Sequence, residues 1–559
     1  MASDDVQSAL QKKLAQIQLE ADERDAQRRA TQLGYPYADL AKLPVALAAI
    51  KLIPETEAKA AHVAAIEIKA QDAALAAYDP TTPAVQTIVK SLEEKRYRVK
   101  LFVCSPPSLE QAWRLYQFVP PPTTSITGKL EISKKHFEEL IGHFTTFRAV
   151  QEEIEKFDFR TTTTTALFET VIAGALANHA SDIHFEAEEK TTKIRYRLDG
   201  ILHDIFGAIP SRNYDSLVSR IKLLSGLKIN VRGEPQDGRF TIGLSNKEVE
   251  MRVSLIPSEF GETIVMRLLD PDSISVNLPD LGLRPDDLSL VHGELAKPNG
   301  LILNTGPTGS GKTTTLYAFL KSIVSPEIKI ITIEDPIEYR VAGVEQTQTD
   351  AEAGYTFASG LRAILRQDPD AILVGEIRDK ETADIAMQAS LTGHMVFSTL
   401  HTNDAVGAVP RLIDLGVRPA TVGPALSLVI AQRLVRLLCP KCKKPVAVTK
   451  DIKAKIDQFL TRLPAHVDQK PYENITVCKP VGCAACNSFG YRGRRGIFEF
   501  MRGGAELEEL ILKESSEVAL RKLAQKQEIV TMQQDGILKV IAGLTTFEEV
   551  EGATGPLVW

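Results

Sequence analysis

The sequence predicts an α/β protein of several domains, with a parallel sheet covered by helices on both faces at its centre. Between residues 280 and 435, short apolar runs alternate with helix-like segments, which is the pattern of such a sheet. A glycine-rich turn joins one of these apolar runs to the helix that follows it. At 559 residues the chain also exceeds what one hydrophobic core organises, so we expect further domains on both sides.

The glycine-rich turn has the pattern GxxxxGK[ST]. It lies between the apolar run Leu301–Leu303 and a helix predicted from Thr314 to Lys321. In this strand–loop–helix context the backbone N–H groups can surround a phosphate, and a chance glycine turn is a much weaker interpretation. Lys312 is expected to reach the β- and γ-phosphates of ATP, and the Thr313 hydroxyl to hold Mg²⁺. The candidate phosphate-binding residues are Gly306, Pro307, Thr308, Gly309, Ser310, Gly311, Lys312, Thr313 and Thr314.

Carboxylates follow two further apolar strands of this region. Residues 329–333 lead into Glu334 and Asp335, and residues 371–374 lead into Gly375 and Glu376. Ligands of such sheets bind beyond the carboxyl ends of the strands, so these side chains are candidates for positioning water or for holding Mg²⁺ through water. Asp335 also fits a helix N-cap. Gly375 stands where an Asp that touches Mg²⁺ usually ends the strand, which argues against direct metal contact.

Two histidines flank the apolar strand at 396–400. His394 and His401 have the ordinary interpretation of structural residues at strand ends. Beside a phosphate-binding loop, however, each could sense the γ-phosphate through a hydrogen bond.

Upstream of the sheet, residues 161–272 are expected to form an arginine-bearing lobe. It should contain a turn at 235–239 and strands at 194–200, 250–255 and 263–269. A solvated strand face is one explanation of its arginines. Next to a nucleotide site, arginines that close over a bound phosphate are the better one. These residues are Arg195, Arg197, Arg239, Arg252 and Arg267.

The remaining segments are assigned by pattern and composition. Residues 1–33 predict a helical extension with Leu10, Leu14 and Ile17 on one face, which is either solvated or binds a partner. Residues 34–118 predict a small α/β domain without catalytic spacing, with strands at 63–68, 72–78 and 98–104 and helices at 82–95 and 109–118. The prolines at 120–122 place a linker at 119–160, and residues 501–559 should be a helical C-terminal region.

Composition limits the classes of function. The net charge is -6 and 44% of residues are hydrophobic, as in ordinary globular proteins, and no apolar run reaches the roughly 20 residues of a membrane span. The acidic N-terminus carries no signal peptide, so we expect a cytosolic protein. A nucleic-acid-handling protein is a rival that this acidity and the lack of an aromatic and basic platform disfavour.

Four of the six cysteines form two CxxC pairs, Cys439/Cys442 and Cys483/Cys486. In a cytosolic chain four thiolates predict a closed, structural Zn²⁺ site, here in a subdomain at 436–500, rather than disulfides. The spacer exceeds that of a zinc ribbon, so an insertion should separate the pairs. A redox role and unrelated buried cysteines are weaker alternatives. A basic strip beside the pairs could meet a membrane-protein partner or acidic lipid, or could simply be solvated. Its members are Arg492, Arg494 and Arg495.

Together, these motifs resemble the secretion ATPase superfamily, specifically its type II secretion and type IV pilus assembly branch. The resemblance rests on the phosphate loop, an aspartate-box-like segment, an atypical Walker B stretch, a histidine box and the cysteines, with weaker matches upstream. The segments concerned are 306–313, 332–339, 365–379 and 392–403, with 180–184 and 235–239 upstream.

The resemblance implies a RecA-like P-loop ATPase core with an upstream PAS-like α/β lobe, a hexamer, and ATP held between the two lobes. It implies that Glu376 and Glu334 act in hydrolysis. It implies that Arg252 and Arg267 reach the γ-phosphate, possibly across a subunit boundary. By the same resemblance, Arg362 and Arg366 form the arginine pair before the Walker B strand and belong to the nucleotide site.

The implied function is a cytosolic motor that hydrolyses ATP at the inner membrane. It would drive an integral platform protein, which moves pilin subunits out of the bilayer, and it would be recruited to the membrane by partners. The cysteines favour pilus extension over retraction, and the long region before Asp182 favours a type IV pilus over the alternative, type II secretion and its pseudopilus. A nucleotide-binding scaffold with little turnover is a further rival. The single near-match Gln32–Gly34 to the Arg-Leu-Gly repeats of some relatives does not predict a cyclic di-GMP site.

Overall fold

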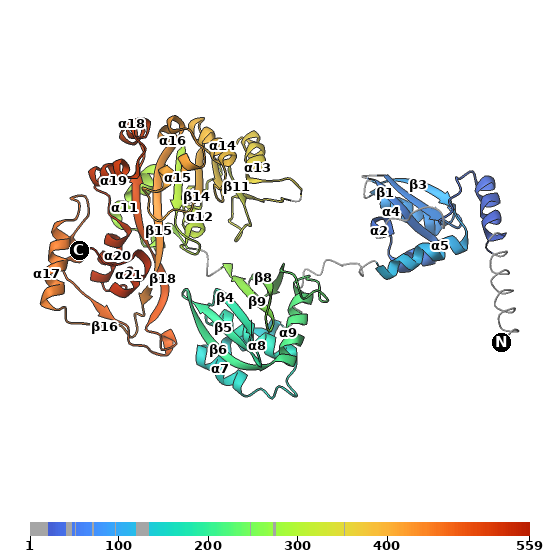
Figure 1. The fold of residues 1–559 in the computed structure, drawn as a ribbon, viewed down its shortest axis with the longest axis horizontal. Coiled ribbons are helices and arrows are strands. Elements are labelled where there is room, and N and C mark those ends of the chain that lie inside the picture. Colours follow the sequence, from blue (N-terminus) through green and yellow to red (C-terminus); the bar gives the residue numbers. More distant parts are fainter. Residues whose placement is uncertain are drawn as a thin grey trace. The chain divides into compact units, whose positions relative to one another are not determined.

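The computed structural model describes residues 19, 21–40, 47–50, 52–69, 72–94, 97–118, 134–245, 247–271, 276–351 and 353–559. They belong to two compact units, residues 1–126 and residues 127–559 (Figure 1). Residues 21–33 are helical, whereas Leu10, Leu14 and Ile17 lie outside the described residues.

The first unit is a small α/β domain. Its sheet has the order β1-β2-β3, with β1 and β2 antiparallel and β2 and β3 parallel. The predicted strands and helices are confirmed, which shows that alanine-rich strands can form where the alanines are buried. The elements are α2 (Leu47–Ile50), α3 (Glu55–Ala60), β1 (Val63–Lys69), β2 (Asp72–Ala77), α4 (Pro83–Glu94), β3 (Arg98–Val103), α5 (Pro106–Trp113) and η1 (Arg114–Phe118).

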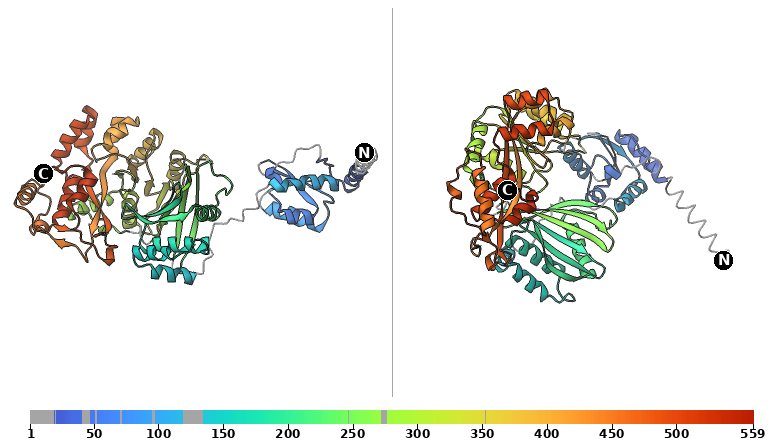
Figure 2. Two further views of the ribbon diagram at one scale, coloured as in Figure 1. Left: turned by 60° about the horizontal axis from the view of Figure 1, so that its bottom comes forward. Right: turned by 60° about the vertical axis from the view of Figure 1, so that its left-hand side comes forward.

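The upstream lobe is a six-stranded antiparallel sheet of order β6-β5-β4-β9-β8-β7. Its strands alternate buried and exposed residues, so one face packs against helices and the other presents charged side chains. The helices lie against one side of the sheet in both views of Figure 2. The elements are α8 (Thr164–Ala177), β4 (Asp182–Ala187), β5 (Thr191–Leu198), β6 (Ile201–Pro210), α9 (Ser211–Leu224), β7 (Gln236–Gly243), β8 (Glu248–Ser258) and β9 (Gly261–Leu269).

The turn predicted at 235–239 is wrong, because residues 236–243 form strand β7. Arg239 pairs with Arg252 of β8, and Phe240 and Ile242 are buried, so the strand register continues through the Asp-Gly pair. A Cβ on Gly238 would lie 2.4 Å from the Ser225 carbonyl oxygen. The glycine therefore marks a close approach of two backbones rather than a turn.

Part of the segment predicted as a linker is folded. Helices α6 (Lys134–His143) and α7 (Phe147–Glu155) pack against α8, with Phe137, Phe144 and Ile154 buried in the core of the lobe. The prolines that suggested a linker precede these helices, and the apolar spacing within 134–155 was the signal that we missed.

The central sheet has seven strands in the order β12-β11-β13-β14-β10-β15-β18. The pairs from β12 to β15 are parallel, and β18 joins β15 antiparallel. Leu301 and Leu303 face one helical layer and Ile302 faces the other, which confirms a sheet covered on both faces. The elements up to β14 are η2 (Leu278–Leu281), α11 (Pro285–Leu295), β10 (Gly300–Thr305), α12 (Lys312–Ile323), β11 (Ile330–Glu334), β12 (Glu345–Gln348), α13 (Phe357–Ile364), η3 (Leu365–Gln367), β13 (Ala371–Val374), α14 (Lys380–Leu391) and β14 (Met395–Leu400).

The C-terminal third both completes this sheet and carries an insertion. Strand β18 comes from the segment that we assigned to the zinc subdomain, and α17 and a two-stranded sheet separate the two CxxC pairs, as the long spacer predicted. The elements are α15 (Ala408–Asp414), α16 (Pro419–Ala425), β15 (Leu426–Leu438), β16 (Lys444–Pro445), α17 (Lys450–Thr461), η4 (Lys470–Tyr472), β17 (Cys478–Lys479), η5 (Ala484–Cys486), β18 (Tyr491–Arg502), α18 (Ala505–Lys513), α19 (Glu517–Lys526), α20 (Met532–Ile541) and α21 (Phe547–Thr554).

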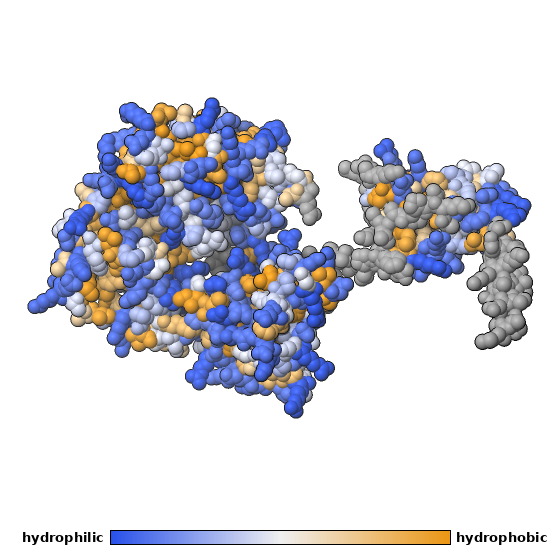
Figure 3. All heavy atoms as spheres, in the orientation of Figure 1, coloured by the Kyte–Doolittle hydropathy of each residue, from blue (hydrophilic) through white to orange (hydrophobic). Residues whose placement is uncertain are grey.

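Hydrophilic residues cover most of the face of residues 127–559 seen in Figure 3, with smaller apolar areas between them. Within the described part of the chain, no helix combines the length and apolar character needed to cross a bilayer.

Candidate functional site

The phosphate loop joins the end of β10 to the first residue of α12. Gly306, Gly309 and Gly311 have φ values of 152°, 78° and 90°, which side chains rarely adopt. A Cβ on Gly306 would lie 2.5 Å from the carbonyl oxygen of Gln432, so the loop also has no room for one. The strand, loop and helix expected from the motif are therefore present in the geometry that a phosphate cradle needs.

The Lys312 ammonium lies inside this loop. Its Nζ donates to the carbonyl oxygens of Gly306 at 2.8 Å and Pro307 at 3.1 Å. Burial lowers the pKa of Lys312 to about 8, although the nearby Glu376 carboxylate acts in the opposite direction. The charge on Lys312 thus depends on whether an anion is close to it.

We expect the affinity for ATP to fall as the pH rises from about 7 to about 9. The folded state lowers the pKa of Lys312 from its usual value near 10.4, so the ammonium that attracts phosphate is lost in this window. Titration with a fluorescent ATP analogue measures the effect. In Lys312→Arg the cation does not titrate, so its weaker binding should be independent of pH in the same window. A wild-type affinity that stays constant up to about pH 9 contradicts this prediction.

Glu376 follows β13 at the carboxyl end of the sheet, as predicted. Its carboxylate pairs with Arg378, and its Oε2 lies 3.6 Å from Nε2 of His401. Burial, followed by the charge of Lys312, lowers the pKa of His401, so the imidazole is neutral near pH 7. A carboxylate beside a neutral imidazole is suited to accepting a hydrogen bond from water.

Glu334 is buried in a polar network beside the phosphate loop. It accepts hydrogen bonds from the Tyr317 hydroxyl, from Thr332 Oγ1 at 2.6 Å and from Gln346 Nε2 at 3.3 Å. Burial raises the pKa of Glu334 in spite of these donors. Its immediate neighbour Asp335 also faces the phosphate loop, but residues 335–344 form no helix, so Asp335 is not a helix N-cap.

Residues of both lobes of this unit line a hollow of about 730 Å³ beside the phosphate loop. The core contributes the loop and the candidate carboxylates, and the upstream lobe contributes charged side chains from β4, β5 and β9. The residues of the core include Thr308–Thr314, Glu334, Asp335, Glu376 and His401. Those of the lobe include Asp182, Arg197 and Arg267.

The arginines of the lobe occupy two different places. Arg267 lines the hollow with its side chain 54% exposed, and its Nε lies 3.0 Å from Oδ1 of the buried Asp182. Arg252 instead binds the aspartate-box segment, where it lies 3.3 Å from Glu338 Oε2 and donates to the carbonyl oxygen of Ile337. The resemblance implied the same role for both arginines, but their positions differ.

Two further arginines line the hollow: Arg197 was among those expected to close over a bound phosphate, whereas Arg494 was not. Arg197 lies 3.4 Å from Asp182 and belongs to the positive strand face that the alternation of β5 identified. Arg494 comes from β18, far away in sequence, and lies in the strip that we had read as membrane-facing or solvated. No local pattern indicated that β18 would bring this side chain to the phosphate loop.

Three predicted nucleotide residues lie elsewhere, and these predictions are corrected. His394 precedes β14, whereas the phosphate loop follows β10. Since the two strands are parallel and in register from 300↔395 to 305↔400, His394 is at the opposite edge of the sheet, where Nδ1 lies 3.1 Å from the Ala389 carbonyl oxygen. Arg362 pairs with Glu381 at 2.6 Å on the surface, and Arg366 donates to the carbonyl oxygen of Arg362. None of the three lines the hollow.

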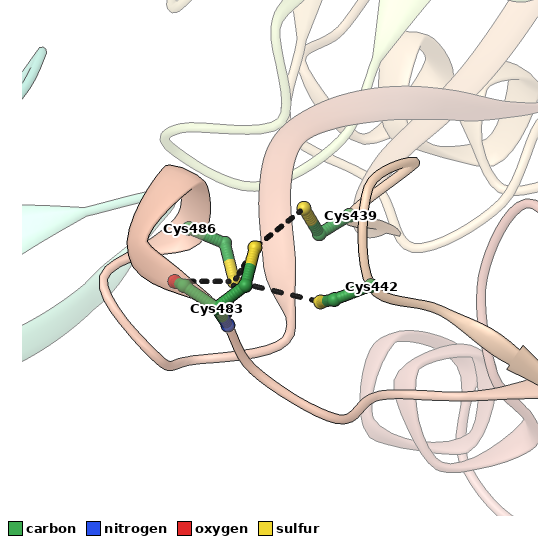
Figure 4. Close-up of side chains that lie close together, drawn as sticks. All are labelled: Cys439, Cys442, Cys483 and Cys486. Atoms are coloured by element: carbon green, nitrogen blue, oxygen red, sulfur yellow. Dashed lines mark hydrogen bonds between the residues drawn. The ribbon is translucent and has the colours of Figure 1, made fainter.

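The four paired cysteines point toward one another (Figure 4). Their sulfur atoms all lie within 4.8 Å of one another, with separations of 3.9 Å for Cys439–Cys483, 3.7 Å for Cys442–Cys486 and 3.8 Å for Cys483–Cys486. A tetrahedral Zn²⁺ with Zn–S bonds of about 2.3 Å separates its ligands by about 3.8 Å, so the arrangement fits this ion. Cys478 is outside the group.

Backbone donors support the thiolate form at this centre. The N–H groups of Cys483 and Gly490 donate to the Cys486 sulfur at 3.2 and 3.3 Å. Burial opposes ionisation of Cys486, but these donors lower the pKa of its thiol to about 7. Because a metal ligand must be a thiolate, these donors favour metal binding by Cys486, whereas burial raises the pKa of Cys442 to about 11.

The loop after the cysteines docks onto the upstream lobe. Asn487 Oδ1 accepts from the backbone N–H of Phe147 at 2.9 Å, and its Nδ2 donates to Asn178 Oδ1 at 3.0 Å. The rings of His203 and Phe489 stack at 4.0 Å between centroids. The four-cysteine centre therefore positions the loop at Asn487 and Phe489, which contacts the upstream lobe.

We expect purified protein to contain about one Zn²⁺ per chain, bound by the four cysteines. Cys486→Ser should lose this metal, lower the melting temperature and expose the Asn487 loop to protease, because structural zinc supplies much of the folding free energy of such knuckles. Elemental analysis and limited proteolysis test this. The matched control is Cys478→Ser, which should retain the metal. Full metal retention in Cys486→Ser contradicts the assignment.

Comparison with known proteins agrees with this geometry. The family model described as type II/IV secretion system protein matches residues 160–552. The chain belongs to this family. A model of the MshEN domain matches residues 33–118, which corresponds to the N-terminal α/β domain.

The relatives in this family include proteins of two systems. The type II secretion system protein E of Aeromonas hydrophila is 46% identical over 69% of this chain and 74% of its own length. The type II secretion system ATPase E of Vibrio cholerae is 46% identical over 69% of this chain and 75% of its own length. The type IV pilus assembly ATPase PilB of Myxococcus xanthus is 37% identical over 94% of this chain and 90% of its own length. Family membership makes the chain a secretion-system ATPase.

Solved structures show the same fold. The Legionella pneumophila ATPase DotB covers 70% of this chain with a TM-score of 0.51 at 22% sequence identity. At this identity the likeness concerns the fold alone.

Proposed function

We propose that this chain is the motor that extends a type IV pilus, working as a homo-hexamer at the cytoplasmic face of the inner membrane. It hydrolyses ATP to ADP and phosphate and acts on an integral platform protein, which in turn moves pilin subunits. The observation that carries this proposal is the hollow that Arg267 of one lobe and Lys312 of the other both line. We expect no role for nucleic acid.

The residues around the hollow divide the chemistry among them. Lys312 and the loop N–H groups bind the triphosphate, and Thr313 would hold Mg²⁺, which neutralises phosphate charge when bound. Glu376, with the neutral His401 beside it, orients the attacking water and accepts its proton. Arg267 stabilises the negative charge that develops on the transferred phosphoryl group. Glu334, buried in its polar network, supports the strand end next to the loop.

Hydrolysis is coupled to motion because the arginine and the phosphate loop sit on different lobes. ATP attracts Arg267 toward Lys312, and loss of the γ-phosphate removes that attraction. The contact of Arg252 with Glu338 and Ile337 ties the same lobe to the aspartate-box segment, so both contacts respond when the lobes separate. These two contacts support a route from phosphate release to mechanical work.

The choice of the pilus is supported by the extent of the similarity. The pilus assembly ATPase aligns with 94% of this chain, including its N-terminal region, whereas the type II secretion proteins align with 69%. A motor of a type II secretion system, assembling a pseudopilus, is the second candidate. The higher identity of 46% within the shared region favours it.

Deletion of the gene for this protein in its native host distinguishes the pilus motor from the secretion motor. A pilus motor predicts loss of surface pili with normal release of secreted enzymes, and restoration by wild type but not by Glu376→Gln. A secretion motor predicts the opposite pair of phenotypes. Electron microscopy of pili and activity of secreted enzymes in the medium are the two measurements.

A further inference from the structure

The buried side-chain amide of Gln432, on β15, supports the phosphate loop. Gln432 is 2% exposed, and its Oε1 accepts hydrogen bonds from Asn304 Nδ2 and from Thr315 Oγ1, both at 2.8 Å. Asn304 is the penultimate residue of the strand before the loop, and Thr315 lies in the first turn of the helix after it. One side chain thus joins both flanks of the loop, from a strand more than a hundred residues away in the chain.

Gln432 also leaves no room for a side chain at two of the loop glycines. A Cβ on Gly306 would lie 2.5 Å from the carbonyl oxygen of Gln432, and a Cβ on Gly311 would lie 2.8 Å from its Nε2. Two of the glycines therefore abut Gln432, one through its backbone and one through its amide. Since both donors are bound to Oε1, the amide N–H₂ is the end that is directed at Gly311.

Gln432 also lines a second hollow, of about 640 Å³, which includes part of the phosphate loop and of α12. Gly311 and Thr314 line both hollows, whereas Glu376 and His401 line only the first. If the γ-phosphate lies beside Glu376, we expect the α-phosphate and the nucleoside to lie nearer the second hollow. The amide N–H₂ of Gln432 is close to Gly311, which lines both hollows.

We propose that Gln432 is a positioning residue for the nucleotide, which fixes the phosphate loop through Oε1 and directs its amide N–H₂ toward the part of the nucleotide that ATP and ADP share. The proposal rests on ATP binding at this loop. Arg267 and Glu376 are placed to distinguish ATP from ADP, whereas Gln432 should treat the two alike. Its loss is thus expected to change affinity rather than the rate of the chemical step.

The deciding variant is Gln432→Glu. Glutamate keeps the shape and an oxygen that accepts from Asn304 and Thr315, but it replaces the N–H₂ donor by a negative oxygen near phosphate. We expect the dissociation constants for ATP and ADP to rise together by at least about tenfold, which corresponds to about 1.4 kcal/mol. Their ratio should stay within about twofold of wild type, and kcat at saturating ATP within about threefold. The control is Gln388→Glu on the exposed side of α14, which adds the same charge away from both hollows and should bind like wild type.

Isothermal titration with ATP and ADP, phosphate release and thermal melting are measured on the full chain. Wild-type affinity for both nucleotides in a folded Gln432→Glu variant overturns the proposal, and so does a loss confined to ATP. If the glutamate variant does not fold, Gln432→Met provides the test. It should weaken ATP and ADP equally, and unchanged affinity again overturns the proposal. Failure of wild type itself to bind ATP would instead overturn the proposed function.

Discussion

The Glu376→Gln variant should release phosphate from ATP at least about 100-fold more slowly than wild type while it still binds ATP. The amide keeps the size of the carboxylate and its place beside His401 at the end of β13. It cannot accept a proton from the attacking water, however, so the chemical step loses its base. Single-turnover phosphate release measures that step, and titration with ATP measures binding separately.

The matched control for this variant is Glu473→Gln, an exposed glutamate of the insertion between the cysteine pairs. Its turnover should equal that of wild type. Phosphate release by Glu376→Gln within about threefold of wild type would remove Glu376 from the hydrolytic step and would revive the interpretation of the chain as a nucleotide-binding scaffold.

Local sequence was sufficient where the chemistry is encoded in consecutive residues. The phosphate loop follows from glycines whose backbone conformations are unusual, and Glu376 follows from the rule that ligands bind beyond the carboxyl ends of parallel strands. The cysteine pairs likewise define a tetrahedral set by spacing and chemistry, without knowledge of the fold.

The same rule shows why His394 was assigned wrongly. His394 and His401 flank one strand, and only the residue after the strand shares an edge with the phosphate loop. A strand rises by about 3.3 Å per residue, so the seven steps from His394 to His401 correspond to about 23 Å. Direction along the strand was enough to exclude His394, but we read nearness in sequence as nearness in space.

Residues brought to the site by long-range pairing could not be inferred. Arg494 reaches the hollow because β18 pairs antiparallel with β15, and Gln432 reaches the loop because β15 lies next to β10. These pairings depend on the packing of the whole core, and the residue periodicity within β15 or β18 does not predict them.

Changing Arg267 to alanine should lower kcat by about 10³-fold, in the range found when an arginine that stabilises a phosphoryl transition state is removed. Arg267 extends into the hollow, and Arg197 continues to pair with Asp182 after its loss, so the lobe should remain folded. Arg252→Ala is expected to act differently. It removes the contact with Glu338 and Ile337 and thus weakens the docking of the lobe.

The two variants can be separated by comparing turnover with lobe position. In Arg267→Ala the lobes should close less tightly on ATP, but the contact of Arg252 with the aspartate-box segment should remain. In Arg252→Ala that contact is lost, so the segment between the lobes should be more sensitive to protease even before nucleotide is added. Arg212→Ala, an exposed arginine in the first turn of α9, is the control for loss of positive charge from the lobe. A protein with both Arg252 and Arg267 changed to alanine that hydrolyses ATP at the wild-type rate would contradict the motor proposal. Neither the arginine that lines the hollow nor the arginine that docks the lobe onto the aspartate-box segment would then have a part in hydrolysis.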